Sequence, residues 1–420
     1  MLDVELIVSE TDLVRQRLAM RGVYPPLEEV LGLDQWRRTL IHEADELRSE
    51  RNQVSRDIGN AKAKPSDKTV NEMRRIGDRI KKIEVDLGSV RSQLSELLLT
   101  IPNLPMTDVP PGTDERSNVV LRTFGEPDEA SDAVEAHWDL GRRLGVIDME
   151  SGARMSGSRW YVLSGKGASL QRALCNWMLD VHVNEHGYTE IAPPMMVRRE
   201  TMIGSGNLPK FSDNLYHDEE DDLWLIPTAE VALNALHSGQ IIPSGSLPMR
   251  YVAHTACFRR EKAAAGRDTR GIKRVHQFEK VEMFRYTEPG QSTLALEEMV
   301  AEATTICERL GLVYRVLELC AGELGFQSSK TYDIEVWAAG SREWLEVSSL
   351  SNCTDFQTRR NGTRYRPQPN GRAALPHTLN GSGLALPRVI IAVLENNLNS
   401  DGTVSVPEVL HPYTAFERLS

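Results

Sequence analysis

The sequence has 420 residues, a net charge of −11 and 40% hydrophobic residues. This length favours two or three domains, and the hydrophobic fraction is enough for a sizeable core. No apolar run approaches the roughly 20 residues of a membrane span, and the first residues, MLDVELIVSETD, contain neither a basic segment nor a cleavable apolar one. These features exclude a membrane protein as the expected class, and we expect a cytoplasmic location with no membrane partner.

The five cysteines are scattered along the chain and include no CxxC pair. An odd number of dispersed cysteines does not form a disulfide framework, and paired cysteines are the usual mark of a structural zinc site. We therefore expect reduced thiols packed in the core, and no zinc.

The region from Leu33 to Leu98 has the pattern of a coiled-coil hairpin. Its second half places apolar residues at alternating steps of three and four, a heptad repeat: Met73, Ile76, Ile80, Ile83, Leu87, Val90, Leu94 and Leu97. Its first half has a looser series: Trp36, Leu40, Ala44, Leu47, Val54 and Ile58. Between them, Pro65 disfavours helix at the residue before it, and Ser66 or Asp67 can cap the next helix. Two antiparallel helices are predicted.

Charge is unevenly distributed along this arm. Residues 51–82, its distal half, hold ten Lys/Arg and four Asp/Glu, a net charge of +6 on an acidic protein. A basic rod suits a nucleic-acid backbone, whereas coiled-coil surfaces are rich in Lys and Glu in any case, so an ordinary solvated surface remains the alternative. Ile101-Pro102-Asn103-Leu104-Pro105 ends the arm, and we place the domain boundary near residue 105.

A second basic segment runs from Phe258 to Phe284. Between Arg259 and Lys280 it has eight Lys/Arg and three Asp/Glu. Residues 252–259 and 277–285 have strand-like patterns, and residues 263–271, with two glycines and small side chains, predict a loop between them. Arginine binds phosphate oxygens with two N–H groups, so such a hairpin suits a polyphosphate, with Phe278 available to stack on a base. The alternative is a solvated basic hairpin.

Three further groups carry candidate chemistry. Thr228-Ala229-Glu230 follows an apolar run, and Glu282 lies on the far strand of the basic hairpin. Glu346 and Ser349, three residues apart, offer oxygen atoms to Mg²⁺. A glycine-rich turn from Asn380 opens a helix with Arg388 in its first turn, which can hold an anion. A helix is also predicted at 168–185, and the strand after it ends in prolines, which suits an edge or an interface.

Taken in order, the segments TAE, FRRE…GRDTRG…RVHQFEKVEMF, EVSSLSNCTDFQ, HTLNGSGLALPR…VLEN and DGTVSVPEVLHPY resemble the seryl-tRNA synthetases, members of the class II aminoacyl-tRNA synthetases. The likeness covers essentially the whole chain. It implies an α+β fold in which a class II antiparallel sheet is flanked by helices, with an N-terminal tRNA-binding domain (1–105, coiled-coil arm about 33–98) and a catalytic domain (106–420). It also implies a homodimer that joins through the segment near 168–195.

The resemblance implies that L-serine and ATP form seryl-adenylate and that the seryl group passes to the 3′ end of tRNA(Ser), and also of tRNA(Sec). Arg259 and Arg388 would be catalytic. Serine would be bound by Thr228, Ala229, Glu230, Arg259, Glu282, Asn380 and Ser382. ATP would be bound by Arg259, Arg260, Glu261, Arg274, Val275, Phe278, Glu346, Val347, Ser348, Ser349 and Arg388. Mg²⁺ would be held by Glu346 and Ser349, and tRNA by Lys62, Lys64, Lys68, Arg74 and Arg75.

Some positions depart from the family pattern. Arg260 and Lys262 stand where small or polar residues are usual, the segment 364–372 is longer, and Leu386-Pro387 replaces smaller residues. These departures leave open a specialised second copy that tolerates a seryl-adenylate-like inhibitor. Two competing hypotheses are a non-catalytic tRNA-binding paralogue and a ligase acting on a carrier protein. The retained arginines argue against the paralogue, and the long arm argues against the carrier-protein ligase.

Overall fold

The computed structural model describes residues 1–61, 66–127, 134–262 and 270–420. They form two compact units. The helical unit comprises Leu2–Ala19 and Val23–Ile101, and the sheet unit comprises Met1, Met20–Gly22 and Pro102–Ser420. None of the helices in the described ranges has the length and hydropathy needed to span a membrane.

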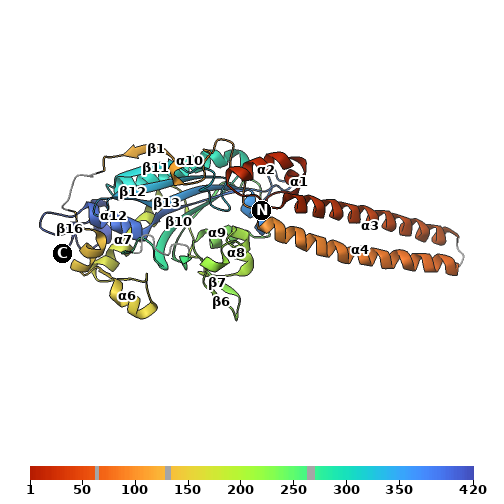
Figure 1. Ribbon diagram of the computed structural model, residues 1–420, viewed down its shortest axis with the longest axis horizontal. Helices are drawn as coiled ribbons and strands as arrows, with labels where there is room; N and C mark the ends of the chain where they lie inside the picture. The colour runs from red at the N-terminus through yellow and green to blue at the C-terminus, as the bar shows by residue number, and fades with distance from the viewer. Residues whose placement is uncertain (62–65, 128–133, 263–269) are drawn as a thin grey trace. The chain divides into compact units, whose positions relative to one another are not determined.

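The helical unit consists of α1 (Val4–Ser9), α2 (Thr11–Met20), α3 (Leu27–Ala61) and α4 (Asp67–Leu99). Helices α3 and α4 lie side by side as a long hairpin (Figure 1). The predicted cap is present, since the Ser66 hydroxyl accepts a hydrogen bond from the Thr69 amide at 3.2 Å. Ion pairs from Arg79 to Glu43 and from Arg48 to Glu84 join the two helices. The coiled-coil prediction is confirmed.

The apolar seam of this hairpin differs from the predicted series at two points. Leu40 and Ala44 are buried against α4, but Trp36 is 48% exposed, so its assignment to the seam is wrong. The seam runs instead through Leu33, which lies seven residues before Leu40, and Trp36 is rotated away from that line. At the C-terminal end of α4, Leu98 is buried in place of Leu97. The buried face of a straight helix shifts gradually from the positions of a strict heptad repeat, so the last buried residue falls one position later.

The sheet unit contains an eight-stranded sheet that is antiparallel except for its last pair, β9 with β4. The strand order is β1 (Val119–Phe124), β11 (Tyr314–Glu318), β12 (Lys330–Ala338), β13 (Glu343–Thr354), β15 (His377–Ala385), β10 (Gln277–Thr287), β9 (Met249–Phe258) and β4 (Thr189–Glu190). Strands β9 and β10 are the two strands predicted around the basic segment, with Gln277 opposite Phe258. Part of the loop predicted between them, residues 263–269, lies outside the described residues.

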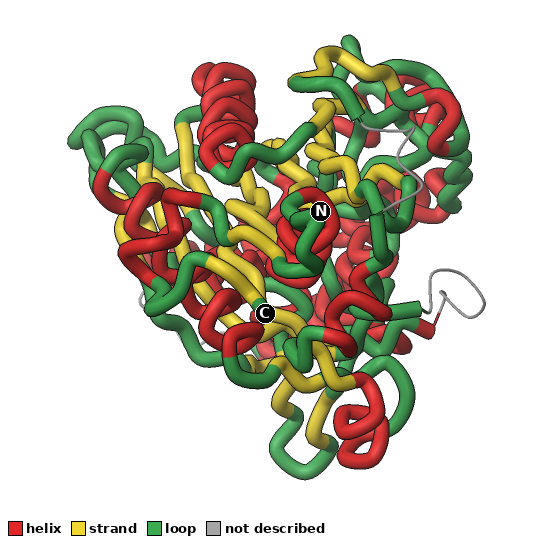
Figure 2. Tube along the Cα trace, turned by 90° about the vertical axis from the view of Figure 1, so that its left-hand side faces the viewer, coloured by secondary structure: helices red, strands yellow, loops and turns green. Residues whose placement is uncertain are grey.

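Side-chain alternation gives this sheet two different faces. Val281 and Met283 of β10 and Ile334 and Val336 of β12 belong to one large apolar core. Residues of α7 (Lys166–Asn184), α10 (Ser292–Arg309) and α12 (Leu386–Asn396) complete that core, and Figures 1 and 2 show helices packed along the sheet. The neighbouring positions Lys280 and Glu282 of β10 and Asp333 and Glu335 of β12 are polar and face the other side.

Two predicted helices have slightly different bounds. The helix expected at 168–185 is α7, and the strand after it is limited to Thr189–Glu190 because Pro193 and Pro194 follow closely. The helix expected after the glycine-rich turn from Asn380 begins at Leu386 and includes Pro387 in its first turn, where a missing N–H leaves no helical hydrogen bond unmade. Arg388 is therefore in the first turn, as predicted.

Shorter elements complete the sheet unit: α5 (His137–Arg143), β2 (Ile147–Asp148), α6 (Met149–Ser156), β3 (Val162–Leu163), β5 (Met196–Arg198), α8 (Arg199–Ser205), β6 (His217–Asp218), β7 (Leu223–Leu225), α9 (Glu230–Ala235), β8 (Ile241–Ile242), α11 (Phe356–Asn361), β14 (Arg364–Tyr365), β16 (Val404–Ser405) and β17 (Arg418–Leu419). Short 3₁₀ segments lie at Glu115–Ser117, Ser212–Asn214, Pro289–Gln291 and Glu408–Tyr413. All five cysteines are buried and free, as expected.

Replacing Ile83 by alanine should destabilise the hairpin by about 2–4 kcal/mol, because Ile83 is completely buried in the α3–α4 seam and its removal leaves a cavity. Urea unfolding followed by helical circular dichroism measures this loss. Val85→Ala, at a position on the same helix that is 72% exposed, is the matched control and should change the unfolding free energy by less than about 0.5 kcal/mol. Equal effects of the two substitutions would contradict the assigned seam.

Candidate functional site

A cavity of about 540 Å³ opens on the polar face of the sheet. Strands β10, β12, β13 and β15 supply much of its lining, together with the segment before α9 and the first turn of α12. The expected substrate-binding residues that line it are Thr228, Glu230, Arg259, Glu261, Arg274, Val275, Phe278, Glu282, Glu346, Val347, Ser349, Asn380, Ser382 and Arg388. The structure therefore brings together, from distant parts of the chain, most of the residues expected for serine and ATP.

Three of the expected residues are not part of the lining. Ala229 is fully buried in a small apolar cluster. Ser348 is also buried, and its hydroxyl donates to the Ser382 carbonyl at 2.6 Å. The Arg260 side chain donates to the Leu215 carbonyl at 2.7 Å and stacks on a nearby tyrosine ring. This direction is opposite to that of Arg259, the adjacent residue at the end of β9.

Glu230, at the first position of α9, is buried and held by amide groups. Its Oε1 accepts hydrogen bonds from Gln357 at 2.6 Å and Gln327 at 3.3 Å. Its Oε2 accepts one from Asn380 at 3.1 Å. Burial, reinforced by the nearby Glu282 carboxylate, raises the pKa of Glu230 to about 7. Amide donors orient this carboxylate without neutralising its charge.

Glu282 forms the second carboxylate of the same end of the cavity. The Lys280 ammonium lies 2.5 Å from Glu282 Oε2 and donates to the Thr228 hydroxyl at 2.7 Å. Asn380 also donates to Glu282, at 3.5 Å. These side chains are all largely buried. Two carboxylates beside one ammonium leave an excess negative charge, and an incoming ammonium group with hydrogen-bonding neighbours would balance it.

Three arginines face the other part of the cavity, two from the connection between β9 and β10 and one from α12. The Arg259 guanidinium lies 5.1 Å from the centre of the Phe278 ring, and its Nε donates to the Pro227 carbonyl at 3.3 Å. Arg274 lies 3.5 Å from Glu261. Arg388 donates to the Glu346 carbonyl at 2.7 Å. Each of these bonds uses only part of the five-donor guanidinium, so the three side chains can also bind phosphate oxygens.

Acidic side chains from β12 and β13 line the cavity close to Arg388. Asp333 lies opposite Ser349, and Glu335 lies opposite Glu346. Burial and the Glu346 charge raise the pKa of Asp333 well above its ordinary value. No described residue donates a hydrogen bond to Asp333 Oδ1, which is buried. A cation beside these oxygens would relieve both the repulsion and the missing contact, so the residues present fit Mg²⁺.

The described part of the chain does not supply a complete metal cage. Within residues 1–61, 66–127, 134–262 and 270–420, no group of three or more His, Cys, Asp or Glu side chains is arranged to hold a metal ion. This agrees with the behaviour of Mg²⁺, which is usually bound through one or two carboxylates together with substrate phosphates and water.

Sequence reasoning missed Lys280, Asp333, Gln327 and Gln357 as site residues. For Asp333 a signal was available, because Thr331, Asp333 and Glu335 alternate with apolar residues along one predictable strand.

Sequence reasoning also overlooked one HxxxH spacing, that of His182 in α7 and His186 just after that helix. Their Nδ1 atoms lie 3.0 Å apart, and burial lowers the pKa of His182 to about 4. The His182 Nε2 atom contacts the Gly383 carbonyl at 3.1 Å. This pair therefore belongs to the packing of α7 and not to the cavity.

The residues expected to bind tRNA lie in the helical unit. Lys68, Arg74 and Arg75 are exposed on α4. Lys62 and Lys64 lie outside the described residues.

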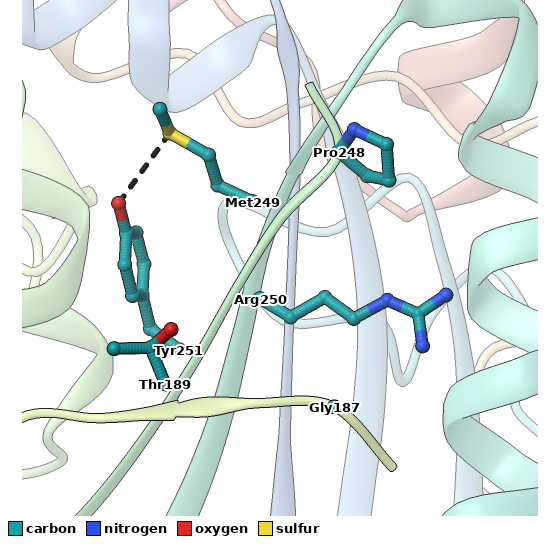
Figure 3. Close-up of a pocket in the computed structure, with 6 residues that line it drawn as sticks. All are labelled: Gly187, Thr189, Pro248, Met249, Arg250 and Tyr251. Carbon is teal, nitrogen blue, oxygen red and sulfur yellow. Dashed lines mark hydrogen bonds between the residues drawn. The ribbon is translucent and has the colours of Figure 1, made fainter. Parts of the chain in front are cut away.

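A second, smaller pocket of about 370 Å³ lies between β4 and β9 and is lined by Gly187, Thr189, Pro248, Met249, Arg250 and Tyr251 (Figure 3). Arg250 is paired with Glu298 at 3.0 Å, and the Tyr251 hydroxyl contacts the Met249 sulfur at 3.4 Å. This pocket contains none of the expected substrate-binding residues. It lies beside the edge strand β4, and two of its lining residues, Gly187 and Thr189, belong to the segment expected to form a dimer.

Comparisons with known proteins agree along the whole chain. Residues 210–397 match the family described as the tRNA synthetase class II core domain (G, H, P, S and T), and residues 1–105 match the seryl-tRNA synthetase N-terminal domain. A protein of Thermomicrobium roseum named serine–tRNA ligase is 54% identical over 98% of this chain and 93% of its own length.

Two solved structures are similar over the full chain. The seryl-tRNA synthetase of Pyrococcus horikoshii complexed with ATP is 37% identical, with a TM-score of 0.94, over 100% of this chain and 99% of that one. The cytoplasmic serine–tRNA ligase of Naegleria fowleri in complex with AMP is 30% identical, with a TM-score of 0.88 and the same coverage. The class II fold predicted from the sequence is confirmed.

We expect the Glu230 carboxyl to titrate near pH 7, since burial disfavours its charged form. Lys280→Met should raise the midpoint further, because the Lys280 charge lowers the pKa of Glu230. Carboxyl NMR of carbon-labelled glutamate follows the titration, and Glu230→Gln identifies the signal by removing it. A midpoint at the ordinary glutamate value in the parent protein would show that the site is hydrated and not buried as described.

Proposed function

Because the chain belongs to the seryl-tRNA synthetases, which ligate serine to tRNA, we propose that its cavity activates L-serine with ATP and that its helical unit binds tRNA(Ser) and tRNA(Sec). The observation that carries this proposal is the pair of buried carboxylates, Glu230 and Glu282, beside a set of arginines in one cavity. The carboxylates suit the ammonium of a small amino acid, and the arginines suit a polyphosphate.

Serine would be recognised through its charge and its hydroxyl. Glu230 and Glu282 would receive the ammonium group, whose positive charge offsets their excess negative charge. Thr228, Asn380 and Ser382 would supply the remaining hydrogen bonds to the substrate. Ala229 would only help to place its neighbours Thr228 and Glu230, since its own side chain packs in an apolar cluster.

ATP would be held at the arginine end of the cavity. Phe278 would stack on the adenine, while Glu261 and the backbone at Val275 would bond its edge. Arg274 and Arg388 would bind the γ-phosphate of a bent nucleotide. Mg²⁺, held by Glu346 and Ser349 together with phosphate oxygens, would neutralise part of the phosphate charge. The acidic end and the basic end thus select the two substrates separately.

In the first step a serine carboxylate oxygen forms a bond to the α-phosphorus, and the bond from that phosphorus to the bridging oxygen breaks, releasing pyrophosphate. Arg259 would stabilise the charge that develops on the α-phosphate in the transition state. In the second step the terminal tRNA hydroxyl attacks the seryl carbonyl carbon and AMP leaves. The bond from that carbon to the phosphate oxygen breaks, and the proton that the hydroxyl loses is carried by the leaving AMP.

The protein would act as a two-fold dimer joined through residues near 168–195. Supporting this, β4 is the edge strand of the sheet, and Met195 and Met196 after it are 42% and 45% exposed. Most apolar residues of α7 face the protein's own core, which leaves the edge strand and the segment after it as the available interface.

The experiment that tests the activity is ATP–pyrophosphate exchange with individual amino acids. Serine should drive exchange about 10⁴ to 10⁵ times more efficiently than alanine, because a site built to bond a hydroxyl leaves buried polar groups unpaired when that hydroxyl is absent. Alanine turnover within tenfold of serine turnover would overturn the assignment. Glu282→Gln serves as a control for the site and should impair the use of serine more than that of ATP.

A second experiment separates tRNA binding from activation. Changing Lys68, Arg74 and Arg75 together to serine should leave serine-dependent exchange nearly intact and weaken tRNA charging, since these exposed side chains lie on the arm. Each lost phosphate contact should also flatten the slope of log affinity against log salt, by about 0.7 to 0.9.

The matched control exchanges the same three residues while keeping their charge: Lys68→Arg, Arg74→Lys and Arg75→Lys. This variant should retain the parent slope. If the serine variant charges tRNA as well as the parent near physiological salt, then tRNA is bound by another surface.

A further inference from the structure

Arg21 is a buried arginine whose partners are backbone carbonyl groups. It lies in the short segment Met20–Gly22 that belongs to the sheet unit, and it is 9% exposed. Its Nη1 donates to the carbonyls of Asn103 at 2.6 Å and Ser328 at 3.1 Å. Its Nη2 donates to the carbonyls of Leu324 and Gly325, both at 2.7 Å. This single guanidinium therefore fixes the backbone of residues 324–328.

Asn103 binds the same backbone through its side chain and its own amide. It is 4% exposed, and its Nδ2 donates to the Gln327 carbonyl at 2.9 Å and the Cys353 carbonyl at 2.8 Å. Its backbone amide donates to the Phe326 carbonyl at 2.9 Å. We refer to Arg21 and Asn103 together as the Arg21–Asn103 clasp. Both residues belong to the sheet unit.

The backbone held by this clasp carries side chains that reach Glu230. Gln327, whose carbonyl bonds Asn103, donates from its side chain to Glu230 Oε1 at 3.3 Å. Cys353, the other carbonyl partner, contacts Asn380 Oδ1 through its thiol at 3.6 Å, and Asn380 donates to Glu230 Oε2. Asn103 therefore bonds the backbone of Gln327, one of the residues that donate to Glu230, and it reaches Asn380, another, through Cys353.

We propose that Arg21 and Asn103 are positioning residues for serine recognition, which hold Gln327 so that its amide orients the Glu230 carboxylate. The inference rests on the proposed role of Glu230 in binding the serine ammonium. A carboxylate fixed by neutral amides keeps its charge for the substrate, but its direction then depends on the backbone that carries those amides. Neither residue of the clasp lines the cavity, so neither touches the substrate.

Asn103→Ala in the full chain tests this link. The variant should raise the KM for serine in pyrophosphate exchange by about tenfold, the effect of losing one hydrogen bond to a charged group. The KM for ATP should stay within about twofold of the parent value, since Gln327 and Asn380, to which the clasp leads, contact Glu230 at the carboxylate end of the cavity. Thermal unfolding and circular dichroism verify that the variant is folded.

Two further variants distinguish positioning from general loosening of the fold. Ser329→Ala removes a buried hydroxyl that bonds the Leu104 carbonyl at 2.6 Å beside the clasp. The substitution leaves in place the bonds from Asn103 to Gln327 and Cys353 and the bond from Gln327 to Glu230, so the KM for serine should not change. Gln327→Met removes the amide through which the clasp acts. In that background Asn103→Ala should add little to the KM for serine.

The inference is overturned if Asn103→Ala leaves the KM for serine unchanged, if its effect adds fully to that of Gln327→Met, or if Ser329→Ala has the same effect. Should Asn103→Ala fail to fold, Arg21→Lys makes the same test, because a lysine keeps the charge but cannot span four carbonyls. A crystal structure of the folded variant decides the positioning claim independently of turnover, since the Gln327 amide should leave Glu230. An inactive parent would defeat the proposed function alone.

Discussion

The cavity depends on holding the Glu230 and Glu282 carboxylates out of water beside a single ammonium group among the described residues, that of Lys280. Removing a carboxylate from water is costly unless hydrogen bonds or an opposite charge compensate. Lys280 supplies the charge for Glu282, and the amides of Gln327, Gln357 and Asn380 supply the hydrogen bonds for Glu230. A second lysine or an arginine in place of the amides would neutralise the charge that the ammonium of the substrate requires. The amides therefore preserve an attraction for the substrate while satisfying the carboxylate in its absence.

The alternation of side chains along each strand of the sheet brings these polar groups to one face. On β15, Asn380 and Ser382 face the cavity, while the alternating residues Gly381 and Gly383 face the other side of the sheet. A Cβ at Gly381 would lie 2.7 Å from the Leu350 side chain, and one at Gly383 would clash with the His182 ring. Close packing on the helix side thus requires glycine and fixes the register that aims the two polar residues at the substrate.

This register also explains how far sequence reasoning could go. The heptads of α4 and the strands flanking the basic loop follow from periodicity, and the position of Arg388 follows from the turn before α12. Asp333 meets Ser349 only because β12 and β13 pair in one particular register, which the sequence does not specify. Similarly, Arg259 and Arg260 are adjacent cations that leave the end of β9 in opposite directions, so composition alone could not separate the one in the cavity from the one bonded to Leu215.

Trp36 shows the same limit in a helix. Trp36 is large and apolar and lies four residues before Leu40, which fits a heptad step. Helical geometry nevertheless places Leu33 on the seam and leaves Trp36 about half exposed. A hydrophobic residue within a heptad-like series is evidence for a buried face only when its phase agrees with residues on both sides. The seam of α4 met that condition along its length, with seven buried residues at regular spacing, whereas the series in α3 was too irregular to fix the phase.

The two units use charge under opposite physical conditions. Lys68, Arg74 and Arg75 of the arm are exposed, so their attraction for a polyanion acts over about a Debye length and weakens as salt is added. The carboxylates and Lys280 in the cavity are buried, where ionic screening is weak and contacts at 2.5–3.5 Å decide the energy. A chain with a net charge of −11 can therefore attract nucleic acid with one segment while it holds excess negative charge in another. The first interaction requires charges that are exposed to solvent, and the second requires charges that are buried. Added salt consequently weakens the binding of tRNA far more than the binding of the amino acid. Because the two charge clusters are separate along the chain, a substitution can change the charge of one cluster without altering the other.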